Sequence, residues 1–132
     1  MADDKALAGE LSVGMMVTLC PKTLLGLGGK PSGPADRWVV GNHFFICLEA
    51  GDKRCRMLPL YSHDGPGRDS LSTDGRTGHP KWTEGTFFFH PVQTWVASRV
   101  SIARAAAVAG DLTRSGTRNM LAEELLPQID AS

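Results

Sequence analysis

The chain has 132 residues, a length typical of one domain, and its 14 basic and 14 acidic residues give a formal net charge of zero. Hydrophobic residues make up 42% of it, so a core can form without a metal or a disulfide. A dedicated nucleic-acid-binding protein is usually more basic overall. Ten basic and five acidic residues nevertheless lie between Lys53 and Arg118. This local surplus could meet phosphate or an acidic protein surface, or it could be a set of solvated side chains.

The cysteines and the first residues indicate a cellular compartment. Cys20, Cys47 and Cys55 are odd in number and form no CxxC pair, which argues against a secreted disulfide scaffold and against a zinc ribbon. The opening residues are acidic and lack the apolar core of a signal peptide, and no apolar run approaches the roughly 18 residues of a membrane span. We therefore expect a cytoplasmic protein that does not enter a membrane.

The first third of the chain predicts one strand between two irregular segments. Residues 1–12 are polar and alanine-rich, which is typical of a flexible tail or of one short helical turn. Residues 13–20 predict a strand that Pro21 ends. Six glycines and prolines between residues 22 and 36 predict a mobile loop.

Two apolar segments in the middle of the chain give the clearest pattern. The near-continuous apolar run in 43–49 predicts a strand that is buried on both faces. A tight turn at 50–53 separates it from a second strand over 54–61, so the two predict an antiparallel hairpin. Pro59 indicates a sheet edge or a bulge near the end of the second strand.

A long polar loop follows the hairpin. It covers residues 62–85, and loops of this length in a compact domain are usually functional or disordered. Two further short strands are predicted over 86–89 and 92–97, and the His90-Pro91 step breaks them apart.

The pattern becomes helical near the C-terminus. Residues 101–109 predict a helix with Ser101 as its N-cap and Gly110 as its end, and residues 116–126 predict a second helix. Five short strands and two helices predict an α+β, mainly β fold, in the form of a small, partly open β-barrel with long loops and a C-terminal helical tail. We expect a flexible tail over 1–12, the barrel over 13–100, and helices packed on the same domain over 101–132.

Three motif-like features do not meet the requirements of the chemistry that they suggest. In 24–31, a proline follows the lysine and a leucine replaces the first glycine of a P-loop. The run 62–64 spells Ser-His-Asp, but adjacent residues cannot easily adopt triad geometry, and turn chemistry explains the run better. The four histidines show no ligand spacing, so we expect no metal and no cofactor, and a metal-dependent hydrolase is the weakest hypothesis.

One group of chemistry-bearing residues remains, in the long loop and at its flanks. It combines cations, imidazoles and one aromatic ring, in His63, Asp64, Arg68, Arg76, His79, Lys81 and Trp82. Such a set could hold phosphate, stack a base and transfer protons in RNA cleavage. It could equally dock on a protein partner, with Trp82 and Arg76 as anchors.

The strand pattern resembles that of the MazF/PemK-type toxins over roughly residues 13–62. Three segments carry the resemblance: Val13-Gly-Met-Met-Val17, His43-Phe-Phe-Ile-Cys-Leu-Glu49 and Met57-Leu-Pro-Leu-Tyr-Ser62. The resemblance implies an SH3-like barrel with a terminal helix, belonging to a bacterial toxin–antitoxin system. It also implies endoribonuclease activity, with RNA and an antitoxin protein as partners, and a homodimer is compatible with it.

The chain departs from the family pattern where the family carries its chemistry. The family's Arg-Pro before the second strand corresponds to Asn42-His43, and its hydroxyl residue maps to Tyr61 or Ser62. The resemblance therefore implies either that catalysis is lost or that His43 and Ser62 perform it.

We expect His43, Ser62 and Arg68 to converge on one groove as catalytic residues. The residues expected to bind RNA or a partner are His63, Arg76, His79, Lys81 and Trp82. The alternative is a non-enzymatic interaction module, an inhibitor or regulator from a mobile element, that binds through the 62–85 loop and the helical tail.

Overall fold

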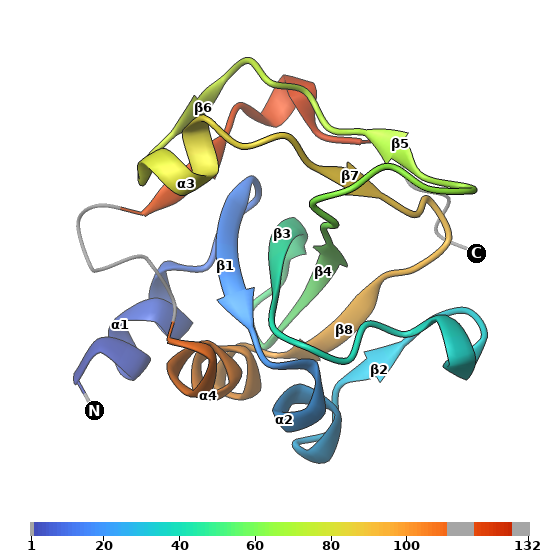
Figure 1. The fold of residues 1–132 in the computed structure, drawn as a ribbon. Coiled ribbons are helices and arrows are strands. Elements are labelled where there is room, and N and C mark those ends of the chain that lie inside the picture. The colour runs from blue at the N-terminus through green and yellow to red at the C-terminus, as the bar shows by residue number, and fades with distance from the viewer. Residues whose placement is uncertain (1, 111–117, 128–132) are drawn as a thin grey trace.

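The computed structural model describes residues 2–110 and 118–127 and shows a strongly twisted sheet between two layers (Figure 1). Helices cover one face of the sheet: α1 (Ala2–Glu10), α2 (Pro21–Gly26) and α4 (Arg99–Ala109). The opposite layer holds short elements: β5 (Asp69–Ser70), α3 (Pro80–Thr83), β7 (Phe88–Phe89) and the 3₁₀ turn η2 (Glu123–Leu125). The end strand of the sheet, β6 (Arg76–Thr77), lies beside α3. The remaining elements are β1 (Met15–Leu19), β2 (Lys30–Pro31), the 3₁₀ turn η1 (Ala35–Arg37), β3 (His43–Ala50), β4 (Arg54–Pro59), β8 (Trp95–Ser98) and β9 (Asn119–Leu121).

Seven antiparallel strands form the main sheet in the order β2-β8-β4-β3-β1-β9-β6. The predicted hairpin is confirmed as β3–β4, in which Ile46 pairs with Leu58 and a bulge lies between Cys47 and Glu49. The end strands β2 and β6 do not pair with each other in the part of the chain that is described, so the sheet is not closed into a barrel. The mixed, mainly β fold is confirmed in this coarser form.

A separate hydrophobic cluster packs on each face of the central strands. Successive side chains of a strand point to opposite faces, so β1, β3 and β4 contribute to both clusters. The helix-side cluster includes Val17, Phe45, Cys47, Cys55, Met57, Trp95 and Ile102. The loop-side cluster includes Met16, Ile46, Leu58, Leu71, Trp82, Phe87 and Leu121. Burial on both faces explains the near-continuous apolar run that was predicted for 43–49.

The helix predicted over 101–109 is confirmed as α4, but it begins two residues earlier. Ser98 rather than Ser101 is its N-cap, because the Ser98 hydroxyl accepts the Ser101 backbone N–H at 3.1 Å. Gly110 ends the helix with a left-handed φ of 68°, as the sequence indicates. Within the described residues, no helix is long and apolar enough to cross a membrane.

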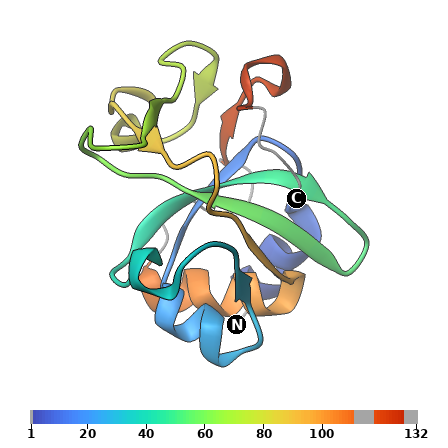
Figure 2. The same cartoon turned by 90° about the vertical axis from the view of Figure 1, so that its right-hand side faces the viewer.

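Two segments that were predicted to be irregular are ordered elements. Residues 1–12 contain α1, because Leu7 and Leu11 lie one helical turn apart and are both buried. The Arg99 guanidinium holds the end of that helix by donating to the Leu11 carbonyl at 2.9 Å. The loop predicted over 22–36 contains α2, β2 and η1, which Figure 2 shows at the edge of the helical layer.

The prediction of a second helix over 116–126 is wrong for the part of that segment that the structure describes. Residues 116 and 117 lie outside the described residues. Residues 119–121 form β9 instead, which fills the free edge of β1 and pairs Met15 with Met120. Hydrogen bonds to two neighbouring strands outweigh the weak helical pattern of this segment.

Two features of the middle of the chain also differ from the prediction. The 62–85 loop is not structureless, since it contains β5, β6 and α3. Pro59 does not mark a sheet edge, because β4 lies inside the sheet. It is the last residue of β4, beyond the final pair with β8 at Met57.

Candidate functional site

A groove lies where the central hairpin meets the loop-side layer. It has two adjoining pockets of about 500 Å³ and about 450 Å³. The larger, which we call the aromatic pocket, is lined by Asn42, Phe44, Leu60, Ser62, His63 and Phe87. The smaller, the tryptophan pocket, is lined by Asp36, Trp38, Val39, Pro66 and His90. His43, Tyr61 and Arg68 line both pockets and therefore form the ridge between them.

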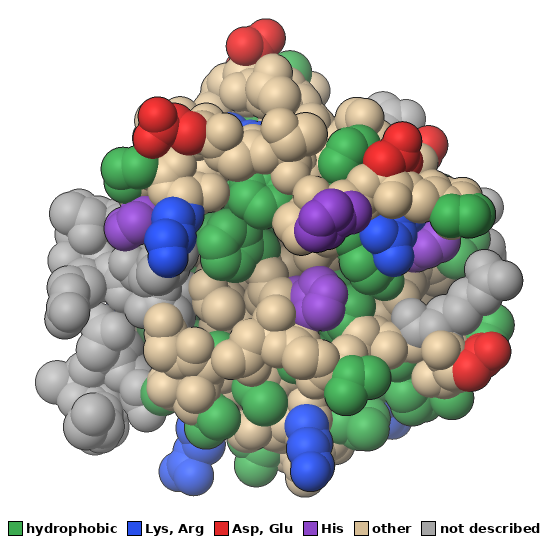
Figure 3. Space-filling model, viewed as in Figure 1, with side chains coloured by type: hydrophobic (Ala, Val, Ile, Leu, Met, Phe, Trp, Pro, Cys, Tyr) green, Lys and Arg blue, Asp and Glu red, His purple; other side chains and the backbone are tan. Residues whose placement is uncertain are grey.

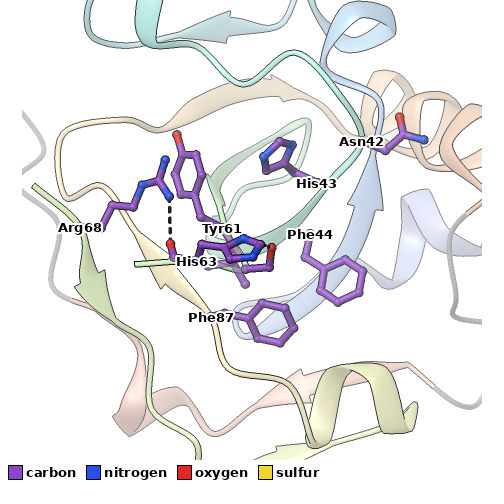
Figure 4. A pocket seen from close by; sticks show the side chains of 9 residues that line it. Asn42, His43, Phe44, Tyr61, His63, Arg68 and Phe87 are labelled. Atoms are coloured by element: carbon purple, nitrogen blue, oxygen red, sulfur yellow. Dashed lines mark hydrogen bonds between the residues drawn. The ribbon is translucent and has the colours of Figure 1, made fainter. Parts of the chain in front are cut away.

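The hairpin register places the first two ridge residues side by side. Beyond the last strand pair, the Leu60 N–H donates to the Phe44 carbonyl at 2.7 Å, which continues the ladder. His43 and Tyr61 follow on opposite strands, with ring centroids 5.5 Å apart and an edge-to-face angle of 78°. Figure 4 shows these rings in the middle of the groove, with Phe44 and Phe87 on one side and Arg68 on the other.

Tyr61 is the centre of the site. The Arg68 guanidinium carbon lies 3.9 Å from the centroid of the Tyr61 ring, which is a close cation–π contact. The His90 ring packs edge-to-face on Tyr61 at 5.6 Å. The Gln93 amide donates to the phenolic oxygen at 3.2 Å, so Tyr61 is fixed at its ring and at its hydroxyl.

His43 is held in one tautomer when it is neutral. Its Nδ1 lies 2.7 Å from the Gly41 carbonyl oxygen, which can only accept a hydrogen bond. Nδ1 therefore carries the proton, and Nε2 keeps its lone pair. An imidazole oriented in this way is suited to act as a general base.

Arg68 carries a positive charge that no carboxylate among the described residues neutralises through an ion pair. Its Nη1 donates to the His63 carbonyl at 2.9 Å, while its Nε is buried without a hydrogen-bond partner. Gly65 leaves room for it, since a Cβ at that position would lie 3.3 Å from the guanidinium carbon. A fixed guanidinium with free donors is suited to bind a phosphate oxygen.

The run 62–64 does not form a catalytic triad. The Ser62 hydroxyl lies 3.0 Å from Nδ1 of His63, but Asp64 turns away and accepts the Gly65 backbone N–H at 2.7 Å. Both Ser62 and His63 are exposed at the rim of the aromatic pocket. The structure therefore places His43, Ser62, His63 and Arg68 on one groove.

The other predicted binding residues lie outside this groove. Trp82 has no exposed surface and Arg76 is only 9% exposed, so neither can anchor a partner. Arg76 Nε donates to the Ser72 carbonyl and its Nη1 donates to the carbonyls of Trp82 and Gly85. Burial lowers the pKa of Arg76. The interaction module that would dock through the 62–85 loop loses both of its proposed anchors.

His79 and Lys81 have separate positions. His79 is the N-cap of α3, where its Nδ1 accepts the Lys81 backbone N–H at 3.1 Å. Lys81 is exposed and lines neither pocket of the groove. His79 therefore has a structural contact, and the predicted binding role of Lys81 stays a prediction.

Sequence reasoning missed two side chains that shape the groove, Trp38 and His90. His90 comes from a segment far from the hairpin in sequence, and Trp38 comes from the irregular segment just before β3, so no local motif marks either residue. The strand break at His90-Pro91 was the only sequence signal near either residue. Figure 3 shows histidine side chains and a basic side chain gathered near the middle of this face.

Acid–base groups, an unneutralised guanidinium and aromatic walls meet in this groove, a set that can bind a phosphate ester and move its protons. Among residues 2–110 and 118–127, no three His, Cys, Asp or Glu residues come close enough to hold a metal ion. No protein-family model, curated protein or solved structure gives a significant match to this chain.

Proposed function

We propose that this protein binds single-stranded RNA in the groove and cleaves it there, as an endoribonuclease related to the MazF/PemK-type toxins. The observation that carries the proposal is that His43, Tyr61 and Arg68 form one ridge, with Ser62 and His63 at its side. The proposal includes an SH3-like origin for the open, twisted sheet. It also includes an antitoxin-like protein as the partner that covers the groove.

The residues of the ridge and its surroundings include a general base and a general acid, which a transesterification requires. Nε2 of His43 takes the proton of the ribose 2′-hydroxyl, whose oxygen attacks the adjacent phosphorus. The bond from phosphorus to the 5′-oxygen breaks, and a protonated imidazole, His63 or His90, gives its proton to that oxygen. The products are a 2′,3′-cyclic phosphate and a 5′-hydroxyl, and no further reactant is needed.

Arg68 supplies electrostatic stabilisation in this scheme. Negative charge grows on the phosphate oxygens as the bond to the 2′-oxygen forms, and a guanidinium held by a carbonyl and an aromatic ring can receive it without reorganising. Ser62 is close enough to His63 to orient its ring.

The aromatic pocket supplies a place for a base. Phe44 and Phe87 lie with ring centroids 5.2 Å apart on its wall. Stacking on such rings contributes about 1–3 kcal/mol per base and does not require a basic protein. A zero net charge is therefore compatible with RNA binding that depends on stacking and on one well-placed cation.

The test uses a purified protein, an end-labelled single-stranded RNA of mixed sequence, and three variants. We expect the wild type to produce fragments that end in a cyclic phosphate, and His43→Asn to cleave on the order of 10²- to 10⁴-fold more slowly while still binding. Arg68→Gln should weaken both binding and cleavage. Lys53→Gln is the matched control, because Lys53 is exposed in the turn between β3 and β4 and does not line the groove. Cleavage that survives in His43→Asn and Arg68→Gln, or RNA that is neither bound nor cut by the wild type, would refute the proposal.

A further inference from the structure

The tryptophan pocket holds a carboxylate that the cleavage scheme does not use. Asp36 lies in η1 and lines this pocket together with Trp38. The Asp36 carboxylate is exposed, and among the described residues it makes no hydrogen bond and no ion pair. An acidic side chain beside a phosphate-binding ridge weakens RNA binding unless it makes a favourable contact of its own.

The walls of this pocket fit a planar ring. Trp38, Tyr61 and His90 are aromatic, and the volume of about 450 Å³ is within the usual range for small-molecule sites. Trp38 is held in place, because its indole N–H donates to the Gly33 carbonyl at 3.1 Å. Its ring also packs edge-on against Trp95 at 6.3 Å, so it offers a fixed surface for stacking.

The carboxylate discriminates between the four bases. It has two acceptor oxygens and no donor, so it requires two parallel donors for a bidentate contact. The Watson–Crick edge of guanine presents N1–H and the 2-amino group side by side. Adenine and cytosine place an unprotonated ring nitrogen beside their amino group, and uracil places two carbonyls around its N–H, so each of them sets an acceptor against the carboxylate.

We infer that the tryptophan pocket is a guanine-specific subsite, in which Asp36 binds the Watson–Crick edge while the base stacks on Trp38. This inference rests on the proposed function and names its substrate class: single-stranded RNA that contains guanine. Because this pocket shares His43, Tyr61 and Arg68 with the aromatic pocket, a guanine bound here places an adjacent phosphate at the ridge. The protein therefore cleaves next to guanine.

The experiment measures the affinity of short 2′-O-methyl oligouridylates that carry one central guanine, inosine or adenine and cannot be cleaved. Inosine lacks only the 2-amino group, so it removes one of the two donors. We expect the wild type to bind the guanine oligonucleotide on the order of tenfold more tightly than the inosine one. Asp36→Asn should bind both equally, because an amide has a single acceptor. Asp52→Asn, in the exposed turn between β3 and β4, is the matched control and should keep the preference.

The outcomes separate the guanine pocket from the wider proposal. If the wild type binds all three oligonucleotides equally, and Arg68→Gln still weakens them, the guanine pocket is refuted and RNA binding stands. If no oligonucleotide binds, the proposed function fails. If guanosine monophosphate alone binds as tightly as the oligonucleotide and inosine monophosphate does not, the pocket is supported, but a free nucleotide replaces RNA as its ligand.

Discussion

Tyr61 decides how well the ridge is organised. Its ring supports the Arg68 guanidinium at 3.9 Å, and His43 and His90 pack against it. Without an aromatic ring at this position, Arg68 would keep only its hydrogen bond to the His63 carbonyl. The site thus depends on a residue that contributes no acid or base of its own to the proposed reaction.

Two substitutions of Tyr61 separate its ring from its hydroxyl. Tyr61→Leu removes the cation–π contact, which is worth about 0.5–1 kcal/mol at an exposed site, so we expect RNA affinity to fall by about two- to fivefold. Tyr61→Phe keeps the ring and loses only the hydrogen bond from Gln93, so its affinity should stay near that of the wild type. Fluorescence anisotropy with a labelled oligonucleotide measures both. An equal loss in the two variants would show that the hydroxyl, not the ring, supports Arg68.

Cys47 and Cys55 form a second residue pair, in the helix-side cluster. The neighbouring Cys47 thiol and the nearby charge of Arg99 lower the pKa of Cys55 to about 7 from the ordinary value of 9.0. The neighbouring Cys55 thiol and burial raise the pKa of Cys47. As the pH rises, the native protein therefore loses the Cys55 proton before the unfolded chain does, and it keeps the Cys47 proton longer.

The sign of the resulting pH dependence follows from these protons. Between pH 7 and 9 the unfolded chain holds more protons on this pair than the native state, so the free energy of unfolding rises with pH. Above pH 9 the unfolded chain loses both protons, while Cys47 in the native state keeps its own. The free energy of unfolding therefore falls again. We expect Cys55→Ala to lack the rise, which is on the order of 2 kcal/mol. Urea unfolding of both proteins at pH 6.5, 9 and 10 measures the difference, and parallel curves would contradict the assignment.

At the scale of elements, Arg76 holds the 72–85 segment in its folded shape. It bonds the carbonyls of Ser72, Trp82 and Gly85, and its guanidinium carbon lies 4.7 Å from the Trp82 ring centroid. A segment that is rich in glycine and polar residues thus gains a buried centre. These hydrogen bonds offset the cost of burying the guanidinium, because the carbonyls of a tight loop would otherwise lack partners.

Arg76→Met should therefore destabilise the protein far more than a comparable change at an arginine that is only half-buried. We expect a loss of about 2–4 kcal/mol, because buried carbonyls lose their donor. Arg56→Met is the control: Arg56 forms an ion pair of 2.8 Å with the exposed Glu49, for which a loss of about 1 kcal/mol or less is typical. The free energy of unfolding in urea measures both variants. Equal losses would mean that Arg76 does not hold the segment.

The elements that could be predicted from the sequence are those whose signal is local. The hairpin β3–β4 has continuous apolar runs and a tight turn, and α4 has a serine cap and a glycine stop, so each is visible in a short window. Strand β9 is not visible in this way, because it exists through its pairing with β1, about a hundred residues earlier. Gly14 shows the same dependence: its φ is +90°, and an added Cβ would contact the Leu121 carbonyl, which is its neighbour only in the folded chain.

The same distinction between local and distant contacts applies to the predicted groove residues. The prediction for His43 and Ser62 followed from strand order and from the resemblance, and that for Arg68 followed from the cationic segment after the hairpin; all three line the aromatic pocket. Trp82 was assigned to a surface because its neighbours in sequence are polar, yet it is buried by residues from other segments. A sequence pattern gives the chemistry of a side chain, whereas its exposure depends on what packs over it.

In the whole molecule, both hydrophobic clusters depend on the same three strands. Met16, Ile46 and Leu58 face the loop-side layer, while their neighbours in β1, β3 and β4 face the helices. If either layer separated, it would expose a wide apolar face of the sheet. The groove is lined by residues of the β3–β4 hairpin and of the segment that packs on it, so its geometry requires both layers to be in place.

This sharing of strands leads us to expect that the two layers unfold together. Trp82 lies in the loop-side cluster and Trp95 in the helix-side cluster, with 0% and 1% of their surfaces exposed, so each reports on one layer. In a Trp38→Phe/Trp95→Phe variant, the fluorescence of Trp82 should follow urea unfolding with the same midpoint as the circular dichroism of the whole chain. Trp38→Phe/Trp82→Phe should give the same coincidence for Trp95. If the Trp82 signal instead changes at a lower urea concentration than the circular dichroism, the loop-side layer opens as a separate unit. The ridge residue Arg68 would then belong to a part of the molecule that can detach from the sheet, and its contact with the Tyr61 ring would be lost when that part opens.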